Sequence, residues 1–309
     1  MNTPVSVLRE VKKALVGKDE VISMALTAIL ARGHILLEDI PGVGKTTMAI
    51  AFSLALGLKY KRMQFTPDVL PSDVVGFSVF DKESGEMIYK PGAILCNLFL
   101  ADELNRATSR TQSALLEAME EGNVTVDGVT HELPDPFIVI ATQNPVGASG
   151  TQLLPDSQLD RFMVRLSLGY PSPEDEIRLI GLKQGGSMLD SVECAVDNEG
   201  LSEMRGRVDE VFVHERIMDY AVRLSLATRE HASLLQGASP RASIAVISMA
   251  KAYAWLSGRD YVVPSDVRNI YPSTVTHRLI LTPDAKASGV TAAKVVAEIL
   301  ENTAAPKVK

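Results

Sequence analysis

The stretch HILLEDIPGVGKTT, residues 34–47, passes from an apolar run into a glycine loop, a lysine, two hydroxyl residues and then a helical pattern. A strand that delivers Gly42 and Gly44 to a helix N-terminus lets backbone N–H groups surround phosphates, because glycine has no Cβ and permits close approach. In this pattern Lys45 adds a positive charge to the phosphates, and Thr46 offers a hydroxyl to Mg²⁺. The stretch therefore predicts a nucleoside triphosphate site.

One residue departs from the usual phosphate-loop pattern G-x-x-x-x-G-K-S/T. Asp39 stands where that pattern has its first glycine. A short glycine-lysine motif also arises by accident in unrelated chains, so the loop alone does not establish the site. Further motifs elsewhere in the chain have to support it.

Composition sets broad limits on the class of protein. The chain has 309 residues, of which 46% are hydrophobic and 22% charged, as in a globular protein with one large domain or two modest ones. Its longest apolar runs fall short of the ~18–20 residues that a membrane helix needs, so we expect no membrane span. The first 15 residues predict an amphipathic helix rather than a secretion signal, and a cytoplasmic location is expected.

Charge and cysteine content exclude further classes. The formal net charge of −7 disfavours a protein whose main task is binding a nucleic-acid backbone. The two cysteines, Cys96 and Cys194, lack the spacing of metal ligands, and a disulfide framework is not expected. We interpret both as small core residues.

Between residues 34 and 168, short apolar runs alternate with helical patterns. Such alternation predicts an α/β fold with a parallel sheet and helices on both faces. In this region the run SRTQSALLEAMEEG predicts a helix that begins with Ser109 as its N-cap and ends at Gly122.

Two segments interrupt the alternation. Each has β-prone flanks around a turn dipeptide, Ser84–Gly85 in one and Asp127–Gly128 in the other, which predicts hairpins at about 77–94 and 123–134. From about residue 171 the patterns are helical, with helices opened by Ser-Pro at 172–173 and at 239–240. We expect an α/β domain over 1–170 and a helical domain over 171–309, with a frayed tail.

Two consecutive carboxylates end the apolar run NLFLADE. Residues at successive strand positions point to different sides, so Asp102 can serve Mg²⁺ while Glu103 faces an attacking water. An apolar strand that ends in Asp-Glu is commonplace and usually solvated. Its position in the same alternating sheet as the glycine loop favours the functional interpretation.

Other polar residues are candidates with open alternatives. Asn144 can hydrogen-bond a γ-phosphate or the lytic water, or can simply form a turn before Pro145. Arg161 can project across a subunit boundary to a neighbour's ATP, or can form a surface ion pair. Arg241 lies in the first turn of a helix, where a bound phosphate or an acid such as Glu215 would compensate its charge.

Together, the segments DIPGVGKT, LADELNRA, ATQNP, LPDSQLDRF and SPRA resemble the AAA+ ATPases, and among them the MoxR family, over roughly residues 5–300. The resemblance implies a P-loop core with a five-stranded sheet in the order 5-1-4-3-2 and an all-α lid. It also implies homo-oligomers, usually hexameric rings, with ATP between subunits. Asp39 fits the MoxR form of the loop, and the two hairpins match insertions of this clade.

The resemblance assigns roles to individual residues. Asp102 and Glu103 match the Walker B pair, Asn144 sensor 1 and Arg241 sensor 2. Arg161 matches the arginine finger, with Arg165 as a second candidate. The segments that would hold the nucleotide are the adenine-pocket residues Val16, Gly17 and Lys18 and the P-loop residues Pro41, Gly42, Val43, Gly44, Lys45, Thr46 and Thr47.

The resemblance also implies an activity. MoxR relatives are chaperone-like ATPases that use ATP and Mg²⁺ to remodel, mature or activate a protein client, often with metal-cofactor insertion and a von Willebrand factor A domain partner. One alternative is a nucleic-acid-stimulated motor, which the acidic composition disfavours. The other is a nucleotide-gated scaffold with negligible turnover, which Glu103 and Arg161 disfavour.

Overall fold

The computed structural model describes residues 3–144, 154–183 and 187–307, so the end of the predicted frayed tail lies outside the described residues. Its main sheet has five strands in the order β2-β5-β8-β1-β9. The strands are β1 (Ile35–Glu38), β2 (Tyr60–Gln64), β5 (Leu98–Asp102), β8 (Ile138–Gln143) and β9 (Val164–Leu166). Counted along the chain, this is the predicted order 5-1-4-3-2, which is confirmed.

The strand pairs β1–β8, β5–β8 and β2–β5 are parallel. Every residue of β5 and β8 is buried, the pattern expected of strands covered on both faces. In register, Gln64 of β2 pairs with Asp102 of β5, and Glu38 of β1 with Gln143 of β8. The carboxyl ends of these strands therefore meet at one edge of the sheet.

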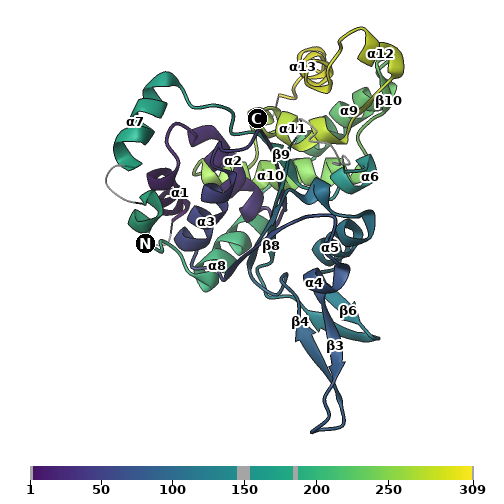
Figure 1. Ribbon diagram of the computed structural model, residues 1–309. Coiled ribbons are helices and arrows are strands. Elements are labelled where there is room, and N and C mark those ends of the chain that lie inside the picture. The colour runs from purple at the N-terminus through teal and green to yellow at the C-terminus, as the bar shows by residue number, and fades with distance from the viewer. Residues whose placement is uncertain (1–2, 145–153, 184–186, 308–309) are drawn as a thin grey trace. The chain divides into compact units, whose positions relative to one another are not determined.

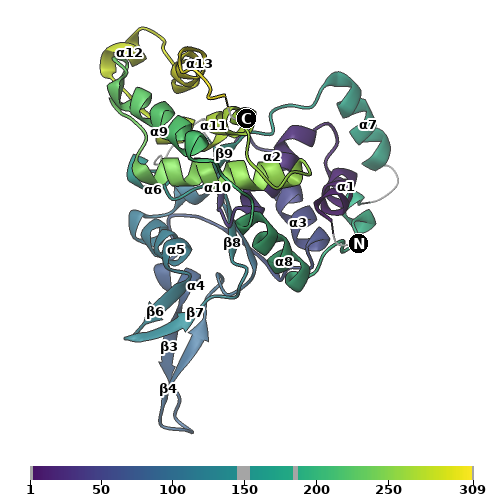
Figure 2. The ribbon, with the colours of Figure 1, turned by 180° about the vertical axis from the view of Figure 1, so that it is seen from behind.

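Helices account for most of the remaining chain (Figures 1 and 2). The α-helices are α1 (Pro4–Ala14), α2 (Asp19–Leu30), α3 (Lys45–Ala55), α4 (Pro71–Val75), α5 (Ser109–Glu121), α6 (Asp156–Leu159), α7 (Pro173–Lys183), α8 (Asn198–Asp209), α9 (Glu215–Glu230), α10 (Pro240–Leu256), α11 (Pro264–Val275), α12 (Pro283–Ala287) and α13 (Ala292–Asn302). Three short 3₁₀ turns are η1 (Leu104–Arg106), η2 (Met188–Ser191) and η3 (Thr276–Arg278).

The chain divides into two compact units. Unit 1 comprises residues 1–22, 34–154 and 167–202, and unit 2 comprises residues 23–33, 155–166 and 203–309. The domain ranges 1–170 and 171–309 follow the order of motifs along the sequence and stay a prediction.

Two antiparallel hairpins occupy the segments where hairpins were predicted, and both belong to unit 1. They are β3 (Gly76–Phe80) with β4 (Met87–Pro91), and β6 (Asn123–Val126) with β7 (Val129–Glu132). The ring of Tyr89 on β4 stacks on that of His131 on β7, with centroids 3.7 Å apart. The two hairpins therefore lie side by side, and β3–β4 extends farther from the sheet (Figures 1 and 2).

The helix ends follow local capping chemistry. Ser239 caps α10 as predicted, since its hydroxyl accepts from the Ala242 N–H. The prediction that Ser109 caps α5 is wrong by one residue: the Thr108 hydroxyl accepts from the Thr111 N–H, while Ser109 already lies in the helix. Gly122 ends α5 in the left-handed conformation at φ 67°, as predicted.

Unit 2 is mainly helical, with a core that includes the fully buried Tyr220 and Tyr271. It also contains a short antiparallel pair, β10 (Leu234–Gln236) with β11 (Ile280–Leu281), which the sequence patterns did not indicate. Within the described ranges, no helix is both long and apolar enough to cross a membrane.

The two cysteines have different environments in unit 1. Cys96 is buried, as predicted, but Cys194 is exposed, so its interpretation as a core residue is wrong. The reason is that the chain around Cys194 forms a loop along the end of α3, where the N–H groups of Ala195 and Val196 donate to the carbonyl oxygen of Ala55.

Candidate functional site

The glycine loop joins β1 to α3 in a conformation that needs glycine. Gly42 and Gly44 have φ values of 86° and 102°, which L side chains rarely adopt. A Cβ on Gly44 would also lie 3.3 Å from Cδ2 of Leu15. Helix α3 begins at Lys45 directly after the loop, so its first N–H groups precede any helical acceptor and face the loop's concave side. The arrangement is suited to binding an anion.

Lys45 directs a positive charge toward the same region. Its Nζ donates to the carbonyl oxygens of Asp39 and Ile40. Burial lowers the pKa of the Lys45 ammonium, and the carboxylates of Asp39, Asp102 and Glu103 oppose that shift. A partly desolvated cation interacts more strongly with a phosphate than one in bulk water.

A cavity of about 340 Å³ opens between the loop and the strand ends, and we call it the carboxylate cavity. Its lining combines the glycine loop with the carboxyl ends of β2, β5 and β8. The lining residues are Pro41, Gly42, Gly44, Lys45, Thr46, Thr47, Arg62, Gln64, Asp102, Glu103, Thr142, Gln143 and Asn144. The structure thus brings together five residues chosen from separate motifs, namely Lys45, Thr46, Asp102, Glu103 and Asn144.

Asp102 is held by two partners in this cavity. Its Oδ2 accepts from Arg62 Nη2 at 2.6 Å and from Arg62 Nε at 3.1 Å. Its Oδ1 accepts from the Thr142 hydroxyl at 2.7 Å. A carboxylate offers about four lone-pair sites, so Asp102 retains capacity for a further ligand.

Glu103 adopts a strained backbone conformation beside Asp102. Its φ of 56° lies in the left-handed region, uncommon for a residue with a side chain. The Glu103 N–H donates to the Thr142 hydroxyl at 2.8 Å, and its carboxylate accepts from Arg106 Nη1 at 2.7 Å. Thr142 therefore contacts both acidic residues through one buried hydroxyl.

The oxygen donors in the cavity fit a magnesium ion. Thr46 and Asp102 both line it, and hydroxyl and carboxylate oxygens are ligands of the type that Mg²⁺ takes alongside phosphate oxygens and water. The spare lone pairs of Asp102 leave room for such a contact beside Arg62 and Thr142.

Four lining residues were not predicted as site residues: Arg62, Gln64, Thr142 and Gln143. Arg62 and Gln64 lie two positions apart on β2, so they share one face of that strand. Polar residues at alternate positions near the carboxyl end of β2 were the signal that could have found them. Gln143 is buried, and its Nε2 donates to Glu38 Oε1 at 3.1 Å.

A second cavity of about 440 Å³ also borders the glycine loop, and we call it the apolar cavity. It is lined mainly by apolar side chains from the end of α1, from α7 and from η2. The lining residues are Ala14, Leu15, Val16, Lys18, Pro41, Gly42, Val43, Gly44, Thr47, Tyr170, Pro171, Glu176, Leu179, Ile180 and Met188. Its apolar walls and its border with the loop suit the base of a nucleotide.

Two of the three residues predicted for an adenine pocket, Val16 and Lys18, line the apolar cavity. Gly17 between them has a φ of 70°, and a Cβ there would collide with the Asp175 carboxylate of α7. Lys18 Nζ donates to the carbonyl oxygens of Gly169 and Tyr170 at 3.2 and 2.8 Å. Residues 16–18 therefore lie against both α7 and the residues that precede α7.

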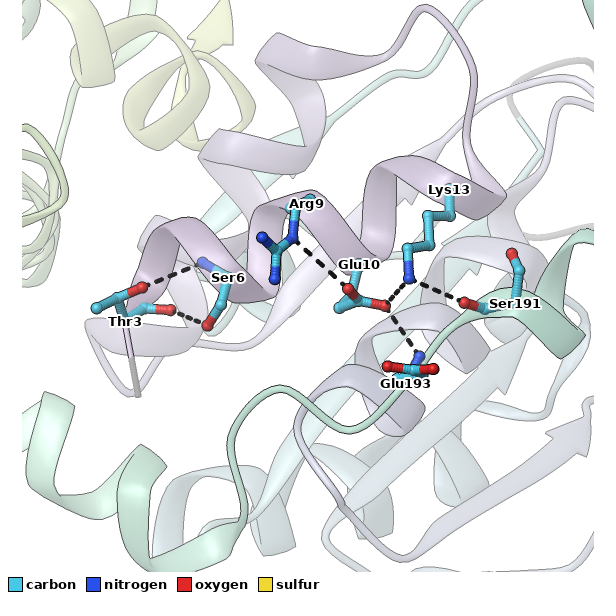
Figure 3. Close-up of polar contacts among 7 residues, drawn as sticks. All are labelled: Thr3, Ser6, Arg9, Glu10, Lys13, Ser191 and Glu193. Atoms are coloured by element: carbon cyan, nitrogen blue, oxygen red, sulfur yellow. Dashed lines mark hydrogen bonds and ion pairs between the residues drawn. The ribbon is translucent and has the colours of Figure 1, made fainter. Parts of the chain in front are cut away.

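A buried carboxylate holds two walls of the apolar cavity together (Figure 3). Glu10 of α1 is 5% exposed, and its Oε2 accepts from Lys13 Nζ and, at 3.0 Å, from the Glu193 N–H. Lys13 also donates to the carbonyl oxygen of Ser191 at 3.1 Å. The hydrogen bond from Lys13 is the main cause that lowers the pKa of Glu10. Helix α1 is thereby joined to the end of η2 and to the residues just after it, and η2 contributes Met188 to the cavity wall.

The predicted arginines belong to unit 2, whereas both cavities are lined by unit 1. Arg161 and Arg165 are half-buried, and Arg241 is exposed at the second residue of α10. Each of these arginines makes an interaction within the protein. Their roles as finger and sensor stay predictions.

Beside them, unit 2 contains a buried cation. Arg278 Nη1 lies 3.0 Å from Asp160 Oδ1 with only 3% of its side chain exposed. Burial lowers the pKa of Arg278 to about 10, with Arg241 adding to that shift and Asp160 opposing it. Asp160 also accepts from the Ser239 hydroxyl at 3.2 Å. The residue before Arg161 is thereby fixed to the N-cap of α10.

Comparisons with known proteins agree with this geometry. Residues 34–164 match the family described as "ATPase family associated with various cellular activities (AAA)", and residues 226–299 match the AAA lid domain. The chain is 46% identical to the uncharacterized protein YeaC of Bacillus subtilis, covering 97% of this chain and 93% of that protein. It is 39% identical to Chaperone MoxR1 of Mycobacterium tuberculosis, covering 97% of this chain and 81% of that protein.

A solved structure is also similar over nearly the whole chain. The crystal structure of a candidate ATPase from Cytophaga hutchinsonii superposes with a TM-score of 0.90 at 37% sequence identity, covering 97% of this chain and 94% of that chain.

Proposed function

The chain belongs to the MoxR family of AAA ATPases, and on this premise we propose that it hydrolyses ATP and uses the turnover for chaperone-like work on a protein client. The observation that carries the proposal is the convergence of Lys45, Asp102, Glu103 and Asn144 on the carboxylate cavity, beside the glycine loop. A second support is the apolar cavity, which borders the same loop. Phosphates would occupy the first cavity and adenine the second.

The residues of the phosphate loop would bind and orient the triphosphate. The N–H groups of Gly42 to Thr47 would surround the β- and γ-phosphates, and the Lys45 ammonium would add a positive charge to them. Val43 lines the apolar cavity with Val16 and Lys18, where base and ribose would lie. Binding in this manner places the γ-phosphate toward the strand ends.

Mg²⁺ would be held by Thr46 and Asp102 and would neutralise charge on the phosphate oxygens when bound. The Thr142 hydroxyl and Arg62 fix the orientation of the Asp102 carboxylate. Since one hydroxyl also holds the Glu103 backbone, Thr142 would fix the spacing between the two acidic residues.

Glu103 would orient and deprotonate the attacking water. Its carboxylate pairs with Arg106 at the cavity, so this pair must open or rotate for Glu103 to accept a proton. Asn144 follows β8 at the same edge and offers both a donor and an acceptor to the γ-phosphate or the water.

Oligomerisation would complete the site. In a homo-oligomeric ring, here proposed as a hexamer in the cytoplasm, Arg161 would stabilise transition-state charge on a neighbour's ATP, with Arg165 as the alternative finger. Arg241 would respond to the γ-phosphate and transmit its loss to the lid. The client would be a protein complex that is being matured. More specifically, the ATPase would assist metal-cofactor insertion and would act with a partner that contains a von Willebrand factor A domain.

The proposal is tested by separating ATP binding from hydrolysis. Glu103→Gln keeps the shape of the side chain but removes the base, so we expect ATP binding within about 2-fold of wild type and a loss of phosphate release of about 100-fold or more. Lys45→Ala is expected to lose both binding and hydrolysis. Normal turnover by the Glu103→Gln protein would contradict the role of Glu103 as the base that deprotonates the attacking water.

The proposed role of Arg161 needs a separate experiment. We expect subunits that carry Arg161→Ala and subunits that carry Lys45→Ala to be inactive when each is assayed alone, whereas a mixed ring would pair an intact loop with an intact finger. We expect partial recovery of phosphate release on mixing. Absence of recovery at every ratio, with co-assembly shown by native mass spectrometry, would contradict a finger that acts between subunits.

A further inference from the structure

We propose that Asp39 is a positioning residue that fixes the base-binding wall of the nucleotide site, an inference that rests on the proposed function. Asp39 is the residue that departs from the usual phosphate-loop pattern. Its backbone lies at the start of the glycine loop, where its N–H donates to the carbonyl oxygen of Gln143 at 3.3 Å. Its side chain, however, is directed to a segment far away in the sequence.

The Asp39 carboxylate holds residues 167–169 against the start of the loop through hydrogen bonds, and we call this set of hydrogen bonds the clip. It is 6% exposed and accepts from the Ser167 hydroxyl at 3.0 Å, from the Gly169 N–H at 3.2 Å and from the Leu168 N–H. A glycine at this position would make none of these contacts. A buried carboxylate is unfavourable unless it is hydrogen-bonded, and charge-assisted bonds are the stronger kind. These hydrogen bonds therefore hold the Asp39 side chain in a single conformation.

The same segment is held on its other side by a cation. Lys18 Nζ donates to the carbonyl oxygens of Gly169 and Tyr170. Residues 167–170 are thus held through N–H groups by Asp39 and through carbonyl groups by Lys18. Opposite charges acting on opposite backbone groups fix both the position and the rotation of this short segment.

The residues that follow the clip line the apolar cavity. Tyr170 and Pro171 both contribute to its wall, and the Tyr170 side chain is 78% exposed in the free chain. An exposed ring at the mouth of an apolar cavity can pack against a planar base, which would bury both surfaces. Asp39 acts on the base through the placement of this ring and does not itself touch the nucleotide.

A competing explanation is that Asp39 only shapes the phosphate loop. The two explanations differ in what they predict for a ligand without a base. If Asp39 shapes the loop, its loss weakens every triphosphate equally. If it fixes the base wall, its loss weakens ATP and spares inorganic tripolyphosphate.

The test compares these two ligands on the full-length protein by titration calorimetry with Mg²⁺ present. In Asp39→Asn, an NH2 group replaces one carboxylate oxygen and the negative charge is lost, so the amide opposes the N–H of Leu168 or of Gly169 with a donor while its remaining oxygen keeps an acceptor. The clip is thereby weakened by at least one charge-assisted hydrogen bond at nearly constant volume. We expect ATP affinity to fall by about 10-fold, the ratio that corresponds to one charge-assisted hydrogen bond, with tripolyphosphate affinity changed by less than about 2-fold. Asp81→Asn, in the turn of the β3–β4 hairpin, is the matched control, and we expect no change with either ligand.

Two results would overturn the inference: an equal loss of affinity for both ligands, or an ATP affinity that does not change. Tyr170→Ala is a second variant, which leaves the clip intact and tests the same inference if Asp39→Asn folds poorly. It is expected to show the same ATP-specific loss, and unchanged ATP affinity in that variant would count equally against the inference. A wild-type protein that binds neither ligand would instead refute the proposed function itself.

Discussion

Replacement of Thr142 by valine tests whether a single buried hydroxyl organises the two acidic residues. The substitution keeps the branched shape of the side chain and removes only its hydrogen bonding. Two contacts are lost: the donation to Asp102 Oδ1 at 2.7 Å and the acceptance from the Glu103 N–H at 2.8 Å. Since Thr142 is 1% exposed, water does not readily replace them.

The expected magnitude follows from these contacts. A neutral hydrogen bond contributes about 0.5–1.5 kcal/mol and one to a charged group about 1.5–3 kcal/mol, so the free energy of unfolding should fall by about 2–4.5 kcal/mol. The left-handed conformation of Glu103 costs about 1–2 kcal/mol, which is close to the contribution of the bond that holds it. Loss of that bond would shift Glu103 out of its competent position and lower kcat by roughly 3- to 10-fold.

The assay is steady-state phosphate release, with ATP affinity and urea unfolding measured on the same preparation. We expect kcat to fall while ATP affinity stays within about 2-fold, because the phosphate loop is untouched. Thr125→Val, at an exposed threonine of the β6–β7 hairpin, is the control and should leave kcat unchanged. A Thr142→Val protein with wild-type kcat, or one whose ATP affinity falls as much as its kcat, would refute the reasoning.

Three further perturbations have outcomes that the structure specifies. Gly17→Ala should weaken ATP binding by about 10-fold or more, because it combines a left-handed φ of 70° with a collision against the Asp175 side chain. Gly85→Ala has a similar φ of 74° but open space around it, and in calorimetry it should leave ATP affinity unchanged. Burial lowers the pKa of His277 from 6.5 to about 3, so the unfolded chain takes up this proton first and stability falls as the pH drops from about 6.5 toward 3. The slope approaches ~1.4 kcal/mol per pH unit, and His277→Gln should reduce it in urea titrations at several pH values; an identical slope would contradict this assignment. Arg62→Gln frees one oxygen of Asp102 and should lower the Mg²⁺ concentration that gives half-maximal phosphate release, while a higher requirement would show that Arg62 assists the metal site.

The parallel sheet was accessible from the sequence because most of its core strands are distinct apolar runs that alternate with helix patterns, whereas the strand order was predicted only from the resemblance to the AAA+ ATPases. β5 and β8 are buried along their whole length, and a continuous apolar run records that directly. Lys45, Asp102 and Asn144 were accessible for a related reason: each lies at or shortly after the carboxyl end of a strand, and the carboxyl ends of parallel strands share an edge.

Other features depend on contacts between distant segments, which a sequence pattern does not record. In the sequence Asp39 is only a departure from a motif, because the partners of its side chain lie near residue 168. Arg62 and Thr142 belong to strands whose patterns identify burial but not the neighbour across the sheet. Cys194 was misassigned because small apolar residues are common in cores, whereas this one lies in a loop.

The central claim is that one glycine loop divides a nucleotide between two cavities, and a crystal structure of the Glu103→Gln protein with Mg²⁺ and ATP tests it most directly. We expect the γ-phosphate in the carboxylate cavity within hydrogen-bonding distance of Lys45 Nζ, and adenine in the apolar cavity against Val16 and Tyr170. A nucleotide bound away from the loop, with Lys45 still donating to the carbonyl oxygens of Asp39 and Ile40, would contradict the claim.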